Sequence, residues 1–185
     1  GTSRAYLFYT AYMLCFCGLL GVTITGDAFN LFVFLEISSI SSYALIAMGK
    51  DRRALLAAYQ YLVIGTIGAT FIVIGIGFLY SATGTLNMAD LGTRIADLPP
   101  SRTLGAAFGF LVVGISLKLA LFPLHRWLPN AYTYAPSMVS AFLAATATKV
   151  AAYVLLRFLF SIFKFDKIIG IVPLDAVLLA LALIA

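Results

Sequence analysis

The chain has 185 residues, of which 63% are hydrophobic and 10% are charged, and its mean hydropathy is +1.06. Soluble domains carry about 25% charged residues, so this composition excludes an ordinary soluble domain and indicates an integral membrane protein. The net charge of +5 does not indicate nucleic-acid binding, because the basic residues are scattered through short loops and form no clustered basic face.

Six stretches are long and apolar enough to cross a bilayer as helices, which takes about 20 mostly apolar residues. They are residues 5–25, 28–48, 55–82, 104–124, 135–162 and 168–185. Strands of a membrane barrel would instead alternate in polarity over about ten residues. The sequence therefore predicts an all-α, polytopic membrane helix bundle that forms a single transmembrane domain over residues 1–185.

The segments between the spans are short. Residues 85–103 hold several charged residues and the Pro99-Pro100 pair, which predicts an extramembrane loop with a short surface helix and a turn. Arg4, the Lys50-Asp51-Arg52-Arg53 group and Arg126 fall on one side of the predicted bundle. The slight excess of lysine and arginine there favours a cytoplasmic location for that side.

The sequence carries no recognisable cofactor site. Cys15 and Cys17 lie two apart on a predicted helix, so they point to nearly opposite faces and are interpreted as packing residues. No nucleotide-binding loop, CxxC pair or His-rich metal spacing is present. Serines 38, 39, 41 and 42 are interpreted as helix-packing and hydration residues. No signal peptide is visible. Because the chain begins with Gly and stops inside an apolar run, we expect it to be a fragment of a longer protein.

Three ionisable residues interrupt the apolar stretches. Glu36 lies in FNLFVFLEISSISSYALI, Lys118 in FLVVGISLKLALF and Lys149 in SAFLAATATKVAAYVLL. A charged side chain near the bilayer centre costs roughly 2.5–3.5 kcal/mol on insertion scales. Residues retained at that cost indicate a functional path through the membrane.

The fourth span is predicted to break just after Lys118. Pro123 has no amide hydrogen and clashes with the carbonyl of Leu119, four residues earlier, so the helix must kink or end there. Broken helices are common at transport sites. The alternative is an ordinary proline kink with a snorkelling lysine. His125, the only histidine, is either a proton-relay residue or an interfacial histidine beside the interface anchor Trp127.

Hydroxyl groups share a helix face with two of the ionisable residues. Ser39 and Tyr43 follow Glu36 at i+3 and i+7, and Thr146 and Tyr153 flank Lys149 at i−3 and i+4. This arrangement suits a hydrated interior path for protons. It suits a satisfied structural ion pair equally well.

These residues resemble a known family, the antiporter-like proton-translocating membrane subunits. It includes the N/M/L-type subunits of complex I, membrane-bound hydrogenase subunits and the D-type subunit of Mrp sodium/proton antiporters. The matching segments are GDAFNLFVFLEISSISSYALI, LYSATGTLNMADL and SLKLALFPLHRWLPNAYTYAPSMVSAFLAATATKVAAYVLLR. The resemblance implies a fold of two inverted five-helix repeats, of which this chain would hold the first and the start of the second.

The resemblance also implies site residues. Glu36 would pair with Lys118 on the broken helix, and Lys149, with His125 after the break, would continue a central proton path. Lysine at position 149 is similar to the proximal complex I type and the Mrp D type. Asn130 departs from the aspartate of many relatives and weakens any loop role there. The second-repeat residue that would complete the path lies outside this sequence.

The leading functional hypothesis is a proton-conducting, antiporter-like subunit of a multisubunit membrane complex in the prokaryotic inner (plasma) membrane. Its partners would be other membrane subunits, protons and the lipid bilayer, with sodium exchange left open and no cofactor bound. The alternatives are a membrane-arm subunit of an NADH:quinone oxidoreductase or hydrogenase, with redox chemistry in other subunits, and an inactive structural scaffold.

Overall fold

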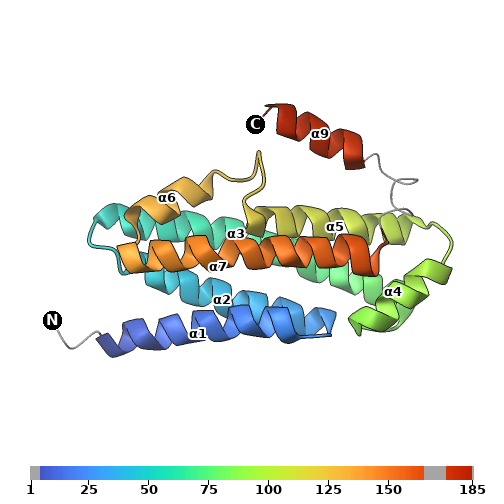
Figure 1. Ribbon diagram of the computed structural model, residues 1–185, viewed down its shortest axis with the longest axis horizontal. Coiled ribbons are helices and arrows are strands. Elements are labelled where there is room, and N and C mark those ends of the chain that lie inside the picture. Colours follow the sequence, from blue (N-terminus) through green and yellow to red (C-terminus); the bar gives the residue numbers. More distant parts are fainter. Residues whose placement is uncertain (1–4, 165–173, 185) are drawn as a thin grey trace.

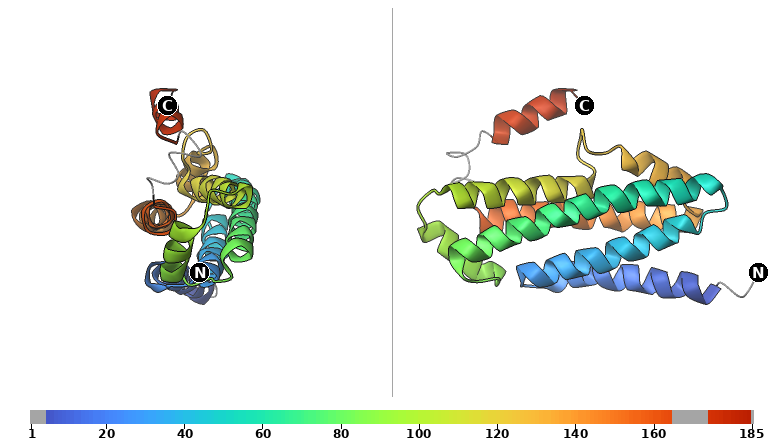
Figure 2. Two further views of the ribbon diagram at one scale, coloured as in Figure 1. Left: turned by 90° about the vertical axis from the view of Figure 1, so that its right-hand side faces the viewer. Right: turned by 180° about the vertical axis from the view of Figure 1, so that it is seen from behind.

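The computed structural model describes residues 5–164 and 174–184. The long helices run side by side along the long axis of the molecule, some in one direction and some in the other, and the short helices lie at an angle to it (Figures 1 and 2). In chain order they are α1 (Ala5–Ile24), α2 (Ala28–Ala47), α3 (Arg52–Thr83), α4 (Met88–Asp97), α5 (Arg102–Leu119), α6 (Trp127–Tyr134), α7 (Ser137–Leu156), the π-helix η2 (Arg157–Ile162) and α9 (Leu174–Ile184).

Five helices among the described residues are long and apolar enough to cross a membrane: α1, α2, α3, α5 and the continuous α7–η2 segment, Ser137–Ile162. The predicted all-α membrane bundle is thus confirmed. The predicted third span, 55–82, extends by a few residues at its start because Asp51 caps α3 by accepting a hydrogen bond from the amide of Arg53. The predicted sixth span, 168–185, lies partly outside the described residues.

The predicted fourth span, 104–124, is broken near its C-terminal end, just after Lys118, as the sequence predicts. Helix α5 stops at Leu119, and after a non-helical turn a separate short helix, α6, begins at Trp127. Apolar residues continue past Leu119, with Leu121, Phe122 and Leu124, so a hydropathy window alone does not detect where α5 ends.

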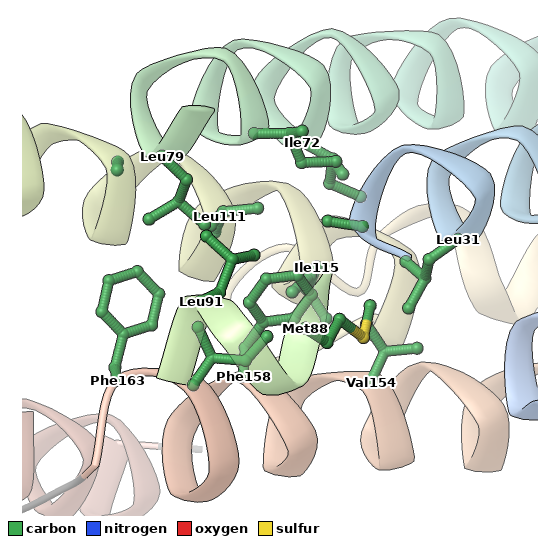
Figure 3. Packing of buried hydrophobic residues seen from close by; sticks show 14 of the residues in the cluster. Leu31, Ile72, Leu79, Met88, Leu91, Leu111, Ile115, Val154, Phe158 and Phe163 are labelled. Carbon is green, nitrogen blue, oxygen red and sulfur yellow. The ribbon is translucent and has the colours of Figure 1, made fainter. Parts of the chain in front are cut away.

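Two buried apolar clusters hold the bundle together. In the first, side chains from α1, α2, α3, α4, α5, α7 and η2 pack together, among them Leu31, Ile72, Leu91, Leu111 and Phe158 (Figure 3). The second cluster joins α1, α2, α3, α6 and α7. It contains Tyr43, Tyr61, Trp127 and Leu143. The second cluster borders the residues that the sequence singles out as functional.

Helices α3 and α5 approach each other closely because glycines face each other. A Cβ atom at Gly114 would lie 2.7 Å from the carbonyl oxygen of Gly68, so any side chain there would push the helices apart. Small residues at such crossings allow membrane helices to pack backbone to backbone. This contact fixes the position of α5, which carries Lys118 one turn further along.

At one end of the bundle the starts of α2 and α4 are held together. Asp27 and Asn87 form an isolated antiparallel bridge and cap their helices, Asp27 by accepting from the amide of Asn30. Arg157 ties η2 to the same region by donating to the carbonyl of Thr25 at 2.7 Å. The depth of α2 in the bundle, and so of Glu36, is thereby set at this end.

The predicted surface helix in the 85–103 loop is confirmed as α4. Helix α4 buries Met88, Leu91 and Ile95 against the bundle and exposes its charged face. It lies at the end opposite the turn between α2 and α3 (Figure 1). Lys50 and Asp51 lie in that turn, and Arg52 begins α3. Which end faces the cytoplasm stays a prediction.

Candidate functional site

The broken helix places Lys118 in the last turn of α5. Ala120 adopts a left-handed conformation, with φ 58° and ψ 41°, and ends the helix. The amide of Leu121 donates to the carbonyl of Ser116 at 3.0 Å, and that of Ala120 to Leu117 at 3.4 Å. These two bonds form a Schellman motif, which normally has glycine at the left-handed position. The break is where the sequence predicts it, but its immediate geometry comes from Ala120 and not from Pro123 alone.

Lys118 and Glu36 form an ion pair across α5 and α2. The Nζ atom of Lys118 lies 3.0 Å from Oε1 of Glu36 and donates a second hydrogen bond to Oγ of Ser39 at 2.7 Å. The lysine side chain is 5% exposed and the glutamate side chain 25% exposed. Glu36 and Ser39 meet the same ammonium because residues three apart on a helix share a face. The predicted pairing of Glu36 with Lys118 is therefore present.

Ser39 differs from the other serines of α2. The hydroxyls of Ser38, Ser41 and Ser42 donate to carbonyls of Leu35, Ile37 and Ser38 on their own helix. Such bonds satisfy the hydroxyl locally and agree with the interpretation of these residues as packing groups. Ser39 instead accepts from Lys118, so it belongs to the site.

The two cysteines point to different surroundings, as their spacing predicts. Cys15 is buried and Cys17 is exposed. The Sγ atom of Cys15 lies 3.3 Å from Oγ of Ser42, where α1 packs on α2.

Packed aromatic rings border the site on the side of α3 and α6. Tyr43 packs edge-on against Tyr61 at a centroid distance of 4.7 Å, and Tyr61 stacks on Trp127 at 4.0 Å with the two planes 2° apart. Gly65 leaves room for the Tyr43 hydroxyl, because a Cβ atom at Gly65 would lie only 2.0 Å from it. The ring of Tyr43 is therefore held in one position beside Ser39.

The interpretation of Trp127 as an interface anchor is wrong. Trp127 is only 3% exposed, and its Nε1 donates to the carbonyl of Leu117 at 3.0 Å. That carbonyl has lost its normal donor four residues later because α5 ends at Leu119, and its bond from the amide of Ala120 is long, at 3.4 Å. A carbonyl freed inside a membrane needs another donor, and the indole supplies it. The polar end of Trp127 thus stabilises the break beside Lys118.

His125 lies in the turn between α5 and α6 and is exposed. Its ring stacks on that of Phe122 at a centroid distance of 5.5 Å. The structure does not bring it into the Glu36–Lys118 pair, and its predicted relay role stays a prediction.

Lys149 lies at the midpoint of the α7–η2 segment, as predicted, but it is exposed and not buried. Its Nζ donates to the carbonyl of Ala144 on its own helix. The hydroxyl of Thr146 donates to the backbone carbonyl of Phe142, and the guanidinium of Arg157 lies over the ring of Tyr153. The two hydroxyl residues that share the helix face of Lys149 therefore interact with other groups and not with its ammonium. Within residues 5–164 no salt bridge joins Lys149 to a carboxylate.

Asn130 lies on α6 and not in a loop. Its Nδ2 donates to Oε1 of Gln60 on α3 at 3.1 Å, so the uncharged side chain helps to hold α6 against α3.

Comparison with known protein families identifies the family of this chain. Residues 25–184 match the family described as NADH:quinone oxidoreductase/Mrp antiporter, TM. The chain belongs to this family. The matched range includes Glu36, Lys118, His125 and Lys149, and the resemblance noted in the sequence is confirmed.

Curated relatives come from both branches that the family description names. The chain is 54% identical over 153 residues to NADH-quinone oxidoreductase subunit N of Desulforudis audaxviator, covering 83% of this chain and 30% of that protein. It is 37% identical over 161 residues to the D subunit of the Na(+)/H(+) antiporter of Alkalihalophilus pseudofirmus, covering 87% of this chain and 33% of that protein. The chain thus spans about a third of the length of these relatives.

Solved structures of respiratory and antiporter complexes contain the same fold. The archaeal membrane-bound sulfane sulfur reductase matches with a TM-score of 0.81 and 35% identity, over 89% of this chain and 34% of that chain. The Mrp complex from Dietzia sp. matches with a TM-score of 0.76 and 28% identity, over 84% and 29%. Respiratory complex I from Thermus thermophilus matches with a TM-score of 0.71 and 30% identity, over 84% and 34%. The chain is therefore an integral membrane protein with the fold of such subunits.

Proposed function

We propose that this chain is part of a proton-conducting, antiporter-like subunit of a multisubunit complex in a prokaryotic plasma membrane, and that Glu36 and Lys118 exchange the protons. The observation that carries the proposal is the 3.0 Å ion pair between a lysine at a helix break and a glutamate near the middle of α2. A charged pair in this setting is costly to keep, since removing two ions from water costs several kcal/mol per ion.

The pair acts as a proton-holding site whose affinity depends on the distance between its members. While Glu36 and Ser39 contact the ammonium, Lys118 keeps its proton, because an opposite charge at this distance favours the ionised form. If Glu36 moves away, the buried ammonium loses its counter-charge and releases a proton to the next acceptor. Renewed pairing then favours uptake of another proton.

Lys149 and His125 are the proposed continuation of the path. Lys149 lies at the midpoint of its span, and His125 lies in the turn that follows Lys118. Both are exposed in this chain, so in the complete subunit each would meet water or residues that this sequence does not include. Proton transfer between Lys118 and Lys149 would complete one half of a transmembrane route.

A second candidate is a membrane-arm subunit of an NADH:quinone oxidoreductase, with the same site driven by redox chemistry in partner subunits. The 54% identity to an oxidoreductase subunit N, against 37% to the D subunit of an antiporter, favours this candidate over a sodium/proton antiporter. Both candidates use the same pair, and they differ in what makes Glu36 and Lys118 separate. An inactive scaffold would need the pair only for stability.

Replacement of Lys118 in the full-length protein within its complex tests the proposal. We expect Lys118→Ala to abolish proton uptake by proteoliposomes while the complex still assembles, because the ammonium is the proton carrier. Lys50→Ala, an exposed lysine in the α2–α3 turn, is the matched control and should leave uptake unchanged. Wild-type uptake by assembled Lys118→Ala complexes would reject the proposal and favour the scaffold.

A further inference from the structure

Two adjoining hollows lie in the groove between α6 and the first half of α3, where the two helices pack against each other (Figure 1). Each has a volume of about 250 Å³. The outer hollow, at the start of α3, is lined by Arg53, Leu56, Ala57, Gln60, Asn130 and Tyr134. The inner hollow shares Gln60 and Asn130 with it and also contains Arg126. One continuous groove therefore has an arginine in each part, and no carboxylate among the described residues lines it.

The guanidinium of Arg53 is held at the outer hollow by Tyr134. Its Nη1 donates to the Tyr134 hydroxyl at 3.3 Å, and its Cζ lies 5.9 Å from the centre of the tyrosine ring. A guanidinium has five N–H donors, so most of them remain free for another acceptor. The carboxylate of Asp51 caps α3 by accepting from the backbone amide of Arg53. Within the described residues neither Arg53 nor Arg126 forms a salt bridge, so both charges are available to an anion from outside the chain.

The amide pair in the middle of the groove presents further donors. Nδ2 of Asn130 donates to Oε1 of Gln60 at 3.1 Å, which occupies the glutamine oxygen. Nε2 of Gln60 makes no hydrogen bond to another described residue, so its two N–H groups can donate into the groove. A groove with two guanidinium groups, an amide donor and no carboxylate is complementary in charge and hydrogen bonding to a phosphate group.

The outer hollow lies at the depth of lipid headgroups. Helix α3 has 32 residues, which makes it about 48 Å long at 1.5 Å per residue, whereas the hydrocarbon core of a bilayer is about 30 Å thick. The first turn of α3, with Arg53, therefore extends beyond the hydrocarbon. In the turns that follow, Leu55, Leu56 and Tyr59 are 59%, 57% and 62% exposed. They form an apolar surface beside the guanidinium, on which acyl chains can lie.

We propose that the groove between α3 and α6 binds an anionic phospholipid, with its phosphate on Arg53 and the Gln60 amide and its acyl chains along the exposed leucines of α3. Arg126 attracts the same charge from the inner part of the groove. Basic pockets between membrane helices bind anionic headgroups in this way. A free phosphate would match the same donors but would leave the adjoining leucines uncovered, so a lipid fits both surfaces. Binding here is independent of the proton exchange proposed for Glu36 and Lys118.

Native mass spectrometry of the full-length protein within its complex tests the proposal, after exchange into phosphatidylglycerol or into phosphatidylcholine with the same acyl chains. We expect wild type to retain one phosphatidylglycerol more per subunit than Arg53→Gln, and equal numbers of phosphatidylcholine. Arg52→Gln, which removes the same charge just outside the groove, is the matched control and should retain the wild-type number. Equal retention by wild type and Arg53→Gln, or an equal loss in Arg52→Gln, would overturn the proposal.

Asn130→Asp tests the same site without changing Arg53. It places a carboxylate in the groove, so we expect it to lose one phosphatidylglycerol as well, and retention of the wild-type number would overturn the proposal. A map of the complex in phosphatidylglycerol nanodiscs should show a phosphate oxygen about 3 Å from the Arg53 guanidinium, continuous with an acyl chain along Leu56. A phosphate without a chain would show a free anion in place of a lipid, and a neighbouring protein subunit in the groove would show a protein contact. Either result would overturn the lipid site.

Discussion

Opposing effects act on the charge of the buried Lys118 ammonium. Burial disfavours its charge, while Glu36 and Ser39 favour it through bonds of 3.0 and 2.7 Å. A buried pair stabilises a protein only when such extra hydrogen bonds satisfy both members. At the residue scale, the proposed proton exchange uses this opposition, because moving Glu36 away would remove the effect that favours the charge.

The fit between Tyr43 and Gly65 gives a stability prediction. Gly65→Ala would bring a methyl group to 2.0 Å from the Tyr43 hydroxyl, so we expect it to destabilise the protein by about 1–3 kcal/mol. Because the hydroxyl is the nearest atom, Tyr43→Phe in the same chain should recover part of the loss. Thermal unfolding of the two single variants and the double variant measures the coupling. Strictly additive effects would mean that the two side chains do not clash.

The sequence predicts part of this site and misses the rest for identifiable reasons. Glu36 and Lys118 can be found because charge in an apolar span is rare, and Ser39 because it shares the helix face of Glu36. The bond from Trp127 to Leu117 joins residues on either side of a turn, and the sequence alone does not show how that turn folds back. A tryptophan a few residues after a predicted helix break is the signal that could have suggested it.

At the scale of the elements, the end of α5 is the decisive feature. The left-handed Ala120 and the indole of Trp127 together satisfy the carbonyls of Ser116 and Leu117. The proline pattern predicts that the helix must end, but it does not predict that the end is an alanine-based Schellman motif. Helix ends depend on such local bonds more than on hydropathy, so the predicted spans agree with the structure in their middles and differ at their ends.

Replacing the alanine at the end of α5 with glycine should increase the stability of the protein. A left-handed conformation costs a residue with a Cβ atom roughly 1–2 kcal/mol, a penalty that glycine does not have. We therefore expect Ala120→Gly to stabilise the protein by about 1 kcal/mol, seen as a raised melting temperature. Ala106→Gly, in the interior of α5, is the control and should lower stability by about 0.5–1 kcal/mol. A lower melting temperature for Ala120→Gly would contradict the left-handed assignment.

Helix α4 should make stability depend on pH in the acid range. Arg94 bonds to Asp90 and, with Thr85, lowers the pKa of that carboxyl below its ordinary value of 3.8. A lowered folded-state pKa means that the contribution is present above the ordinary pKa and is lost as pH falls through the lowered one. The melting temperatures of wild type and Asp90→Asn should therefore differ at neutral pH and converge in acid. A difference that persists in strong acid would refute the ion pair as its cause. Arg94→Gln should show the same pH-dependent part, together with a constant loss from the bond that Arg94 donates to the carbonyl of Thr83.

At the scale of the whole molecule, the bundle presents a lysine to its surroundings in the middle of a membrane span. Lys149 is exposed here, although a charge facing lipid at the bilayer centre costs roughly 2.5–3.5 kcal/mol. The chain spans about a third of its relatives' length, so residues outside this sequence are expected to shield that face. The expectation that the chain is a first repeat with the start of a second stays a prediction. The sequence predicts the depth of Lys149 but not its exposure, because depth follows from the chain and exposure from what packs beside it.

Lys149 should be required for transport by the complete subunit. We expect both Lys149→Ala and Lys149→Arg to block proton uptake by proteoliposomes that contain the whole complex, since arginine scarcely deprotonates. Assembly should be intact in both variants, as judged by the recovery of the purified complex. Wild-type rates for Lys149→Ala would reduce Lys149 to a structural residue and place the relay elsewhere.

The account depends most on the claim that Lys118 releases its proton during turnover and does not simply hold a fixed charge against Glu36. Lys118→Arg separates these roles, because arginine can keep the ion pair but does not deprotonate in proteins. The measurement is proton uptake by proteoliposomes containing the assembled complex, compared at equal protein with wild type. We predict that Lys118→Arg assembles and does not transport. Transport at the wild-type rate would show that a permanent cation suffices at this position, and would contradict proton exchange by the pair.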